Sequence, residues 1–283
     1  MFWASRHFGG VAAMTDRPDG WILSTRELLL AWKAADGIDF PLCLSSGDPE
    51  RYDDGDHARK VLSQIGYELE AAMTPSKRAA MSAFTRPRYS LAVSGLDASR
   101  SHEEGSHYIR MYAAWSGGDT GYIASQKALP DPNLGGEVTV TAHPFAQWTR
   151  SLADLLPTVE AGRLPADTAV PLTTFIVADR EIPIVDTSAD RNSAATAFVH
   201  RMPSTCGNIT AAVGSITEGR RPDALDLRWH DIPDDGRYLL IVDPSAPTAT
   251  AMPATSIEVA KMINRSLNAL KQRHQAGADT ART

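Results

Sequence analysis

The sequence predicts a mixed α/β domain in which a central, mostly antiparallel β-sheet is flanked by helices. Two observations support this prediction. Segments rich in β-branched and aromatic residues follow one another in two groups of four, separated by short turns, and each group ends in an amphipathic helix. Strands joined by such short turns pair antiparallel. The repetition predicts one continuous sheet with pseudo-twofold repeated halves, covering about 87–157 and 193–272.

The composition fits a globular domain with a buried core. The chain has 283 residues, of which 43% are hydrophobic and 22% charged, close to the average for such domains. The formal net charge is −6, whereas a nucleic-acid-binding domain would carry a concentrated basic face. No stretch contains the roughly 20 apolar residues of a membrane span. We therefore expect no nucleic-acid partner and no membrane insertion.

The two cysteines, Cys43 and Cys206, stand far apart and form no CxxC pattern. A disulfide scaffold or a zinc site is therefore not expected, and the reducing cytoplasm is the simplest location. Residues 1–19 contain no apolar run of the length found in secretory signal peptides, so they are expected to be a disordered tail or a translated upstream start. A single domain is expected over 20–272, followed by a disordered tail over 273–283.

Three helices are predicted before the first strand. Ser24 and Glu27 have the spacing of a capping box, and the helix that they begin stops at Gly37. A second helix is predicted over about 55–73, where apolar residues recur at steps of three and four. Thr74 and Pro75 are an N-cap and a proline in the first helical position, and begin a short helix that ends near Phe84.

The first group of strands is predicted in SLAVSGL, HYIRMYAAW, TGYIASQKAL and GGEVTVTAHP, with a hairpin turn at 115–119. A helix with one apolar stripe follows Pro144 and ends at Pro157. Residues 157–193 are expected to be a linker that contains one edge strand within VPLTTFIV. The second group lies in GNITAAVGSI, ALDLRWHDI, GRYLLIVD and TATAMP, and a helix follows over about 254–272.

The sequence contains one cluster of residue types that ligate metals: His102, Glu103, Glu104 and His107. The cluster lacks the helical HExxH spacing, and Ser and Gly flank it between two predicted strands. A solvated loop explains it better. A metal-assisted hydrolase that uses His102, Glu104 and His107 remains an alternative hypothesis.

Other catalytic patterns are missing from the sequence. It contains no GxSxG elbow and neither of the glycine patterns that bind phosphates. Cys206 precedes a predicted strand and is interpreted as a small core residue. Asp231, Asp234 and Asp235 lie close to His230 in the sequence. However, Pro233-Asp234-Asp235-Gly236 has the composition of a hairpin turn, in which Asp and Gly serve the backbone geometry. We therefore predict no catalytic residue, no metal and no cofactor.

The most specific segment is GRRPDALDLRWHDIPDDGRYLL (219–240), which resembles the EspG family. In that family a Gly-Arg-Arg turn joins two strands, and a hairpin with Asp, Gly, Arg and Tyr leads into the last strands and a closing helix. GWILSTRELLLAWKAADGIDFPLCL is similar to the family's opening tryptophan, its helix with a second tryptophan and its proline-led strand. FTRPRYSLAVSG is similar to its passage from helix to strand. The resemblance extends over about 21–270.

This resemblance implies a non-enzymatic export chaperone of the type VII (ESX) secretion pathway in the cytoplasm of actinobacteria. Such a chaperone would bind the PPE subunit of a PE/PPE heterodimer and cover its apolar tip, because an exposed apolar patch promotes aggregation. A homodimer with a structural role, formed through the sheet, is a second alternative.

By analogy with the family, the partner would bind one face of the sheet and part of the C-terminal helix. Strand alternation places Tyr108, Arg110 and Tyr112 on one face, and likewise Asp226, Arg228 and His230. We expect these two sets, together with Lys261 and Asn264 on the exposed side of the last helix, to contact the partner. The core is then expected to include Trp115, Leu225, Leu227 and Trp229.

Overall fold

The computed structural model describes residues 20–37, 39–50, 54–100, 107–166, 168–171, 198, 201–216, 224–242 and 248–280. The predicted N-terminal tail, His102, Glu103 and Glu104, most of the predicted linker, and the Gly-Arg-Arg turn at 219–221 lie outside these residues.

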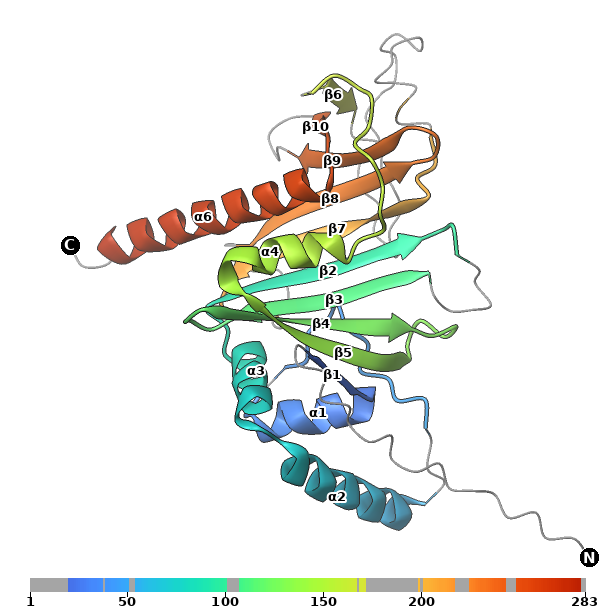
Figure 1. Ribbon diagram of the computed structural model, residues 1–283, viewed down its shortest axis with the longest axis vertical. Coiled ribbons are helices and arrows are strands. Elements are labelled where there is room, and N and C mark those ends of the chain that lie inside the picture. The colour runs from blue at the N-terminus through green and yellow to red at the C-terminus, as the bar shows by residue number, and fades with distance from the viewer. Residues whose placement is uncertain are drawn as a thin grey trace, which may run out of the picture.

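Ten strands of the described chain form one sheet, whose strands are stacked along the long axis of the molecule (Figure 1). The strands are β1 (Gly20–Leu23), β2 (Tyr89–Asp97), β3 (Tyr108–Trp115), β4 (Thr120–Ala128), β5 (Gly135–Pro144), β6 (Thr168–Pro171), β7 (Thr205–Val213), β8 (Leu225–Ile232), β9 (Gly236–Val242) and β10 (Thr248–Pro253). Their order is β1-β5-β4-β3-β2-β7-β8-β9-β10-β6, and every neighbouring pair is antiparallel. The predicted fold class is confirmed.

The strand order has the symmetry expected of two repeated halves. Strands β2 and β7 pair at the centre, with Val93 opposite Ile209. From this pair outward, β3, β4 and β5 follow on one side and β8, β9 and β10 on the other. Each four-strand group is followed by a helix, and a four-residue strand closes each edge of the sheet. Strand β6 pairs with β10 and shares only its last two residues with VPLTTFIV, where an edge strand is expected; the rest of that run lies outside the described residues.

Two of the five helices in the described chain begin at the cap residues that the sequence predicts. The five helices are α1 (Thr25–Ala34), α2 (Gly55–Ala72), α3 (Pro75–Thr85), α4 (Phe145–Asp154) and α6 (Ser256–Thr280). At α1, Ser24 and Glu27 form the complete capping box. At α3, the side chain of Thr74 accepts a hydrogen bond from the Lys77 amide, and Pro75 opens the helix.

One face of the sheet is covered by α4 and α6, and α4 lies in front of the strands in Figure 1. Leu91, Val93 and Ile209 of the central strands pack there against Trp148 of α4 and Ile263 of α6. Leu227 and Trp229 belong to this core, as expected. Trp115 and Leu225 are half-buried and pack against its margin.

The opposite face is covered in two separate regions. Helices α1 and α3 cover β3, β4 and β5, where Trp32 and Phe84 pack on Tyr112 and Tyr122. A second core lies over β8, β9, β10 and β6, where Phe198 packs edge-on against Tyr238. Strands β2, β7 and most of β8 lie between these two regions.

Three segments differ from the sequence-based expectation. Gly20–Leu23 form strand β1 ahead of α1, although the sequence predicts three helices before the first strand, because they pair with β5, far away in the chain. Residues 40–44, similar to a proline-led strand of the family, are irregular, because the Leu44 amide donates to the carbonyl of Pro41 and closes a turn there. Helix α6 continues to Thr280, whereas 273–283 are expected to be a disordered tail. Lys271 to Ala276 are all exposed, so strong helix formers rather than packing extend the helix there.

Candidate protein-binding face of the sheet

Two of the residue sets predicted to bind a partner lie on the same face of the sheet. The strand registers align them in three rows that cross β3, β2, β7 and β8. The rows are Tyr112–Ala92–Thr210–Asp226, Arg110–Ser94–Asn208–Arg228 and Tyr108–Leu96–Cys206–His230. Because neighbouring strands are about 4.8 Å apart, the two sets stand about 14 Å from each other. Sequence alternation could not reveal that β2 and β7 lie between them.

The middle of this face is open. We call it the central strip, and it consists of Ser94, Leu96, Asn208, Thr210, Asp226 and Arg228. Ser94, Leu96 and Asp226 are exposed, and the other three are half-buried. Leu96 exposes 42% of its surface, which is high for a leucine in the middle of a sheet. Tyr108, half-buried, is its partner on β3. Our site prediction overlooked Leu96, although alternation in SLAVSGL places it with Ser94.

The polar side chains of the central strip are only partly satisfied within the described chain. Asp226 accepts hydrogen bonds from the Thr210 hydroxyl at 2.6 Å and from the Asn208 amide at 3.2 Å. Arg228 makes no ion pair with any residue that the structure describes. The strip therefore presents one oriented carboxylate and one guanidinium beside an exposed leucine, a mixture typical of protein interfaces.

Tyr112 is not available to a partner. Its side chain is fully buried beneath α1 and α3, and its hydroxyl donates to the carbonyl of Phe84 at 3.3 Å. Burial raises the pKa of this phenol far above its usual range. Alternation correctly gives the face to which Tyr112 points, but the helices that cover β3 come from a distant part of the sequence.

Arg110 is largely committed to the fold. It is 9% exposed, and its guanidinium donates to the carbonyls of Leu134 (3.0 Å) and Pro132 while lying 5.0 Å from the centre of the Tyr108 ring. These contacts fasten the loop between β4 and β5 to β3. Arg110 therefore supports the margin of the central strip more than it offers a free cation.

His230 is also buried, with 8% of its surface exposed. Burial, and to a smaller extent the positive charge of Arg228, lower the pKa of this imidazole to about 4. The side chain is consequently neutral at pH 7. It can contribute shape to the end of the central strip, but it carries no charge there.

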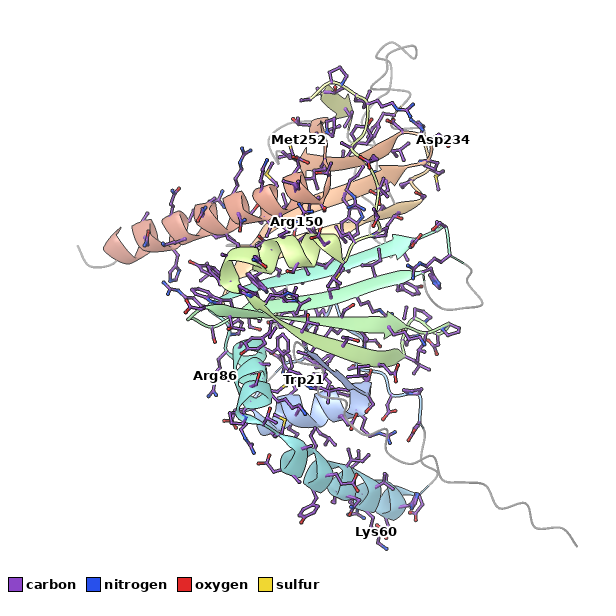
Figure 2. The ribbon with its side chains drawn as sticks, in the orientation of Figure 1. Trp21, Lys60, Arg86, Arg150, Asp234 and Met252 are labelled. Carbon is purple, nitrogen blue, oxygen red and sulfur yellow. The ribbon has the colours of Figure 1, made fainter. Side chains whose placement is uncertain are left out.

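Lys261 and Asn264 lie elsewhere. Both are exposed on α6, whose buried side packs on the face of the sheet opposite to the central strip. Exposed apolar residues lie on or next to the two helices that cover that face: Phe145 at the start of α4, Leu155 directly after its end, and Ile257 on α6. Figure 2 shows Arg150 of α4 on this same side of the molecule. The eight predicted contact residues therefore do not form one continuous surface.

The hairpin that carries the resemblance is structural. Asp231 and Arg237 form a bidentate ion pair at 2.7 and 2.8 Å, each side chain 1% exposed, and Arg237 also donates to the carbonyl of Pro157. Asp234, at the tip of the hairpin in Figure 2, has a positive φ of 58° and is followed by Asp235. The motif thus fastens the segment after α4 to β9.

Tyr238 of the same motif secures the next residues of that segment. Its hydroxyl accepts hydrogen bonds from the amides of Arg163 and Leu164 and donates to Asp235. A Cβ atom at Gly162 would lie 1.9 Å from the Tyr238 ring, so glycine is required for this close approach.

The residues of the hydrolase hypothesis and Cys206 can be placed in part. The described chain brings together no group of three or more potential metal ligands. His107 is buried, and its ring packs on Tyr108 with the centroids 4.1 Å apart, while His102 and Glu104 of the hydrolase hypothesis lie outside the described residues. Burial raises the pKa of the Cys206 thiol, and nearby Asp231 raises it further, which disfavours the nucleophilic thiolate.

A search against models of protein families matches residues 24–265 to the EspG family. No curated protein matches the chain. Among the described helices, none is long and apolar enough to cross a bilayer. The family match covers strands β2 to β10, helices α1 to α4, the first part of α6 and the central strip, and leaves out the edge strand β1.

Proposed function

The chain belongs to the EspG family of ESX secretion-associated chaperones, and we propose that it is a non-enzymatic cytoplasmic chaperone that binds the PPE subunit of a PE/PPE heterodimer. It would cover the apolar tip of the PPE protein, keep the pair soluble and release it for type VII secretion. As predicted from the sequence, the binding unit would be a single domain over about 20–272.

The open central strip is the observation that supports this proposal, because it offers a surface to which a partner protein could bind. Leu96 and Tyr108 supply apolar contact area, and Arg228 supplies a cation that the described chain leaves without an ionic partner. Tyrosine and arginine are the residue types that most often dominate binding energy at interfaces. An interface of standard size needs about 800 Å² from each partner, so contacts would extend beyond the strip.

A second surface is kept in the proposal because exposed apolar residues accompany Lys261 and Asn264. Ile257 exposes 47% and Leu155 49% of its surface. The two surfaces lie on opposite sides of the sheet. Reversing one charge on each side, in separate variants, therefore shows which surface binds the partner. Arg228→Glu tests the central strip, and Lys261→Glu tests the outer side of α6.

The decisive experiment is co-expression with PE/PPE pairs encoded in the same genome, followed by size-exclusion chromatography with light scattering. We expect a 1:1:1 complex with at least one pair. Failure to form a complex with any native pair would overturn the proposal. A chain that runs alone as a stable dimer and ignores every pair would favour the structural homodimer instead.

The hydrolase alternative has its own test. A metal-assisted hydrolase would retain a stoichiometric metal ion after purification without chelator, measurable by inductively coupled plasma mass spectrometry. We expect none. Stoichiometric metal that is lost in a His102→Ala/His107→Ala variant would revive the hydrolase.

A further inference from the structure

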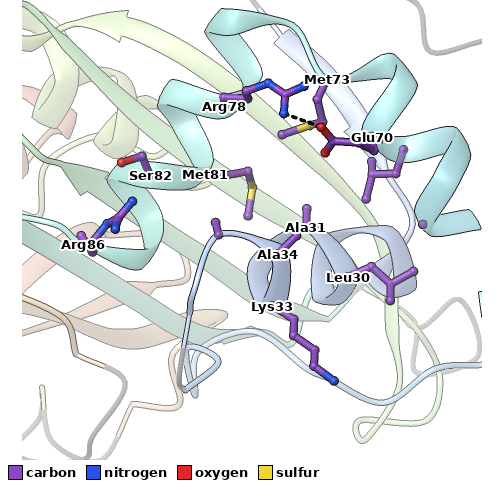
Figure 3. A pocket seen from close by; sticks show the side chains of 13 residues that line it. Leu30, Ala31, Lys33, Ala34, Glu70, Met73, Arg78, Met81, Ser82 and Arg86 are labelled. Carbon is purple, nitrogen blue, oxygen red and sulfur yellow. Dashed lines mark hydrogen bonds and ion pairs between the residues drawn. The ribbon is translucent and has the colours of Figure 1, made fainter. Parts of the chain in front are cut away.

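Helices α1, α2 and α3 lie at the end of the molecule away from α6 (Figure 1). Side chains of these helices line a cavity of about 600 Å³, seen from close by in Figure 3. Its apolar wall combines side chains from all three helices: Leu30, Ala31, Leu69, Met73 and Met81. In Figure 3, Met81 of α3 points toward α1. The volume falls within the range of about 300–1,000 Å³ that is usual for small-molecule sites.

The cavity is bounded by a glycine in the middle of α2. Gly66 lines it, and a Cβ atom built at this position would meet nothing within 4 Å. Glycine inside a helix costs about 1 kcal/mol relative to alanine, and at Gly66 no close contact with the described chain requires it. The missing side chain leaves space that belongs to the cavity.

Positive charge predominates at the cavity, although the whole chain has a net charge of −6. Lys33, Arg78 and Arg86 line it, against a single acidic residue, Glu70. Arg78 is paired with Glu70 at 2.9 Å, as the dashed line in Figure 3 marks. Lys33 and Arg86, both exposed, form no ion pair within the described part of the chain.

We propose that this cavity binds a single-chain anionic amphiphile, that is, a fatty-acid-like molecule with one carboxylate. Its alkyl chain would contact Leu69, Met73 and Met81 and occupy the space beside Gly66. Its carboxylate would lie at the rim beside Arg86, because an anion is favoured next to a cation that no carboxylate of the described chain compensates. The site lies outside the central strip, so this proposal does not depend on cargo binding.

Isothermal titration of the full chain with dodecanoate, below its micelle concentration, tests the proposal. We expect one site per chain with a dissociation constant below about 100 µM, and a concentration-dependent rise in melting temperature. Gly66→Leu is expected to abolish binding because its side chain fills the cavity. Gly66→Ala is the matched control, since it adds a single carbon and should retain most of the affinity.

Two further measurements test the anionic head. Arg86→Ala is expected to weaken dodecanoate binding about tenfold, through loss of a charge-assisted contact. Dodecan-1-ol should bind wild type at least tenfold more weakly than dodecanoate. Circular dichroism and thermal melting of each variant verify that it folds.

Three results would overturn the proposal. They are the absence of saturable dodecanoate binding, binding that Gly66→Leu leaves unchanged, and equal affinity for the acid and the alcohol. The first two would show that the cavity is not the site, and the third that its cations do not select the ligand. None of these results would bear on complex formation with a PE/PPE pair.

Discussion

The indole of Trp229 lies directly against the backbone of Gly207, its neighbour across the β7–β8 pair. A Cβ atom at Gly207 would be 2.1 Å from Cη2 of this ring, and one at Gly95, the next residue across the sheet, would be 2.7 Å from its Cζ2. Two glycines from the central pair of strands therefore form the floor on which a fully buried tryptophan rests.

Gly207→Ala should consequently destabilise the fold. The added methyl group overlaps a ring that α4 and α6 prevent from moving away, so we expect a loss of about 1–3 kcal/mol in the free energy of unfolding, measured by urea denaturation. Gly66→Ala serves as control and should be neutral or stabilising, because its new methyl group meets nothing. Equal stability of Gly207→Ala and wild type would contradict the packing described.

Because Asp231 and Arg237 form a buried ion pair, substitutions at the two positions should have strongly non-additive effects on the free energy of unfolding. Asp231→Leu leaves the Arg237 guanidinium without its carboxylate in a site where both side chains are 1% exposed, and should cost about 3–5 kcal/mol. The double variant Asp231→Leu/Arg237→Met should lose less than the sum of the two single variants. Additive losses in a double-mutant cycle by chemical denaturation would argue against the pair.

The lowered pKa of His230 predicts that the folded chain loses stability in mild acid. Its pKa is about 4 in the folded chain and about 6.5 when unfolded, so protons bind the unfolded state first as the pH falls. The free energy of unfolding should be unaffected by His230 above pH 6.5 and should decrease between pH 6.5 and 4, by up to about 3 kcal/mol.

Urea midpoints at pH 7 and pH 4.5 measure this effect. His230→Gln should flatten the difference between the two midpoints, whereas His274→Gln, at an exposed position of α6, should leave it unchanged. If His230→Gln keeps the full pH dependence of wild type, the protonation of another group is responsible.

Charge reversal should identify the face that binds a partner. With a purified PE/PPE pair, Arg228→Glu is expected to weaken binding by about 1–3 kcal/mol, because a half-buried arginine on the central strip would face the partner. Lys261→Glu, on the opposite side, should change affinity by less than about 0.5 kcal/mol. Biolayer interferometry distinguishes the two, and the reverse order would assign binding to the outer side of α6.

Local sequence signals located most of the elements. The capping box at Ser24, the Thr74–Pro75 pair and the alternation in each strand depend on contacts over a few residues, and the structure bears them out. The strand suggested at 40–44 is wrong because family similarity was not matched by local geometry: Pro41 there accepts the hydrogen bond of a turn.

The site was harder to predict because it depends on long-range packing. Alternation gives the face of the sheet on which Tyr112 and Arg228 each lie, but it does not give their burial. Tyr112 is fully buried, whereas Arg228 is half-buried. The difference comes from α1 and α3, which cover β3 but not β8. Arg110 is expected to contact the partner, but its guanidinium instead donates to a carbonyl of the β4–β5 loop.

The sequence by itself determined the two repeated groups of strands, the caps of the helices, the acidic balance and the family, since each depends on composition or on residues close together in the chain. Only the tertiary structure decided that β2 pairs with β7, that the central strip stays open between two covered regions, and that three helices line a cavity beside Gly66. These features arise from contacts between distant segments, and no local periodicity encodes which surface a helix will cover.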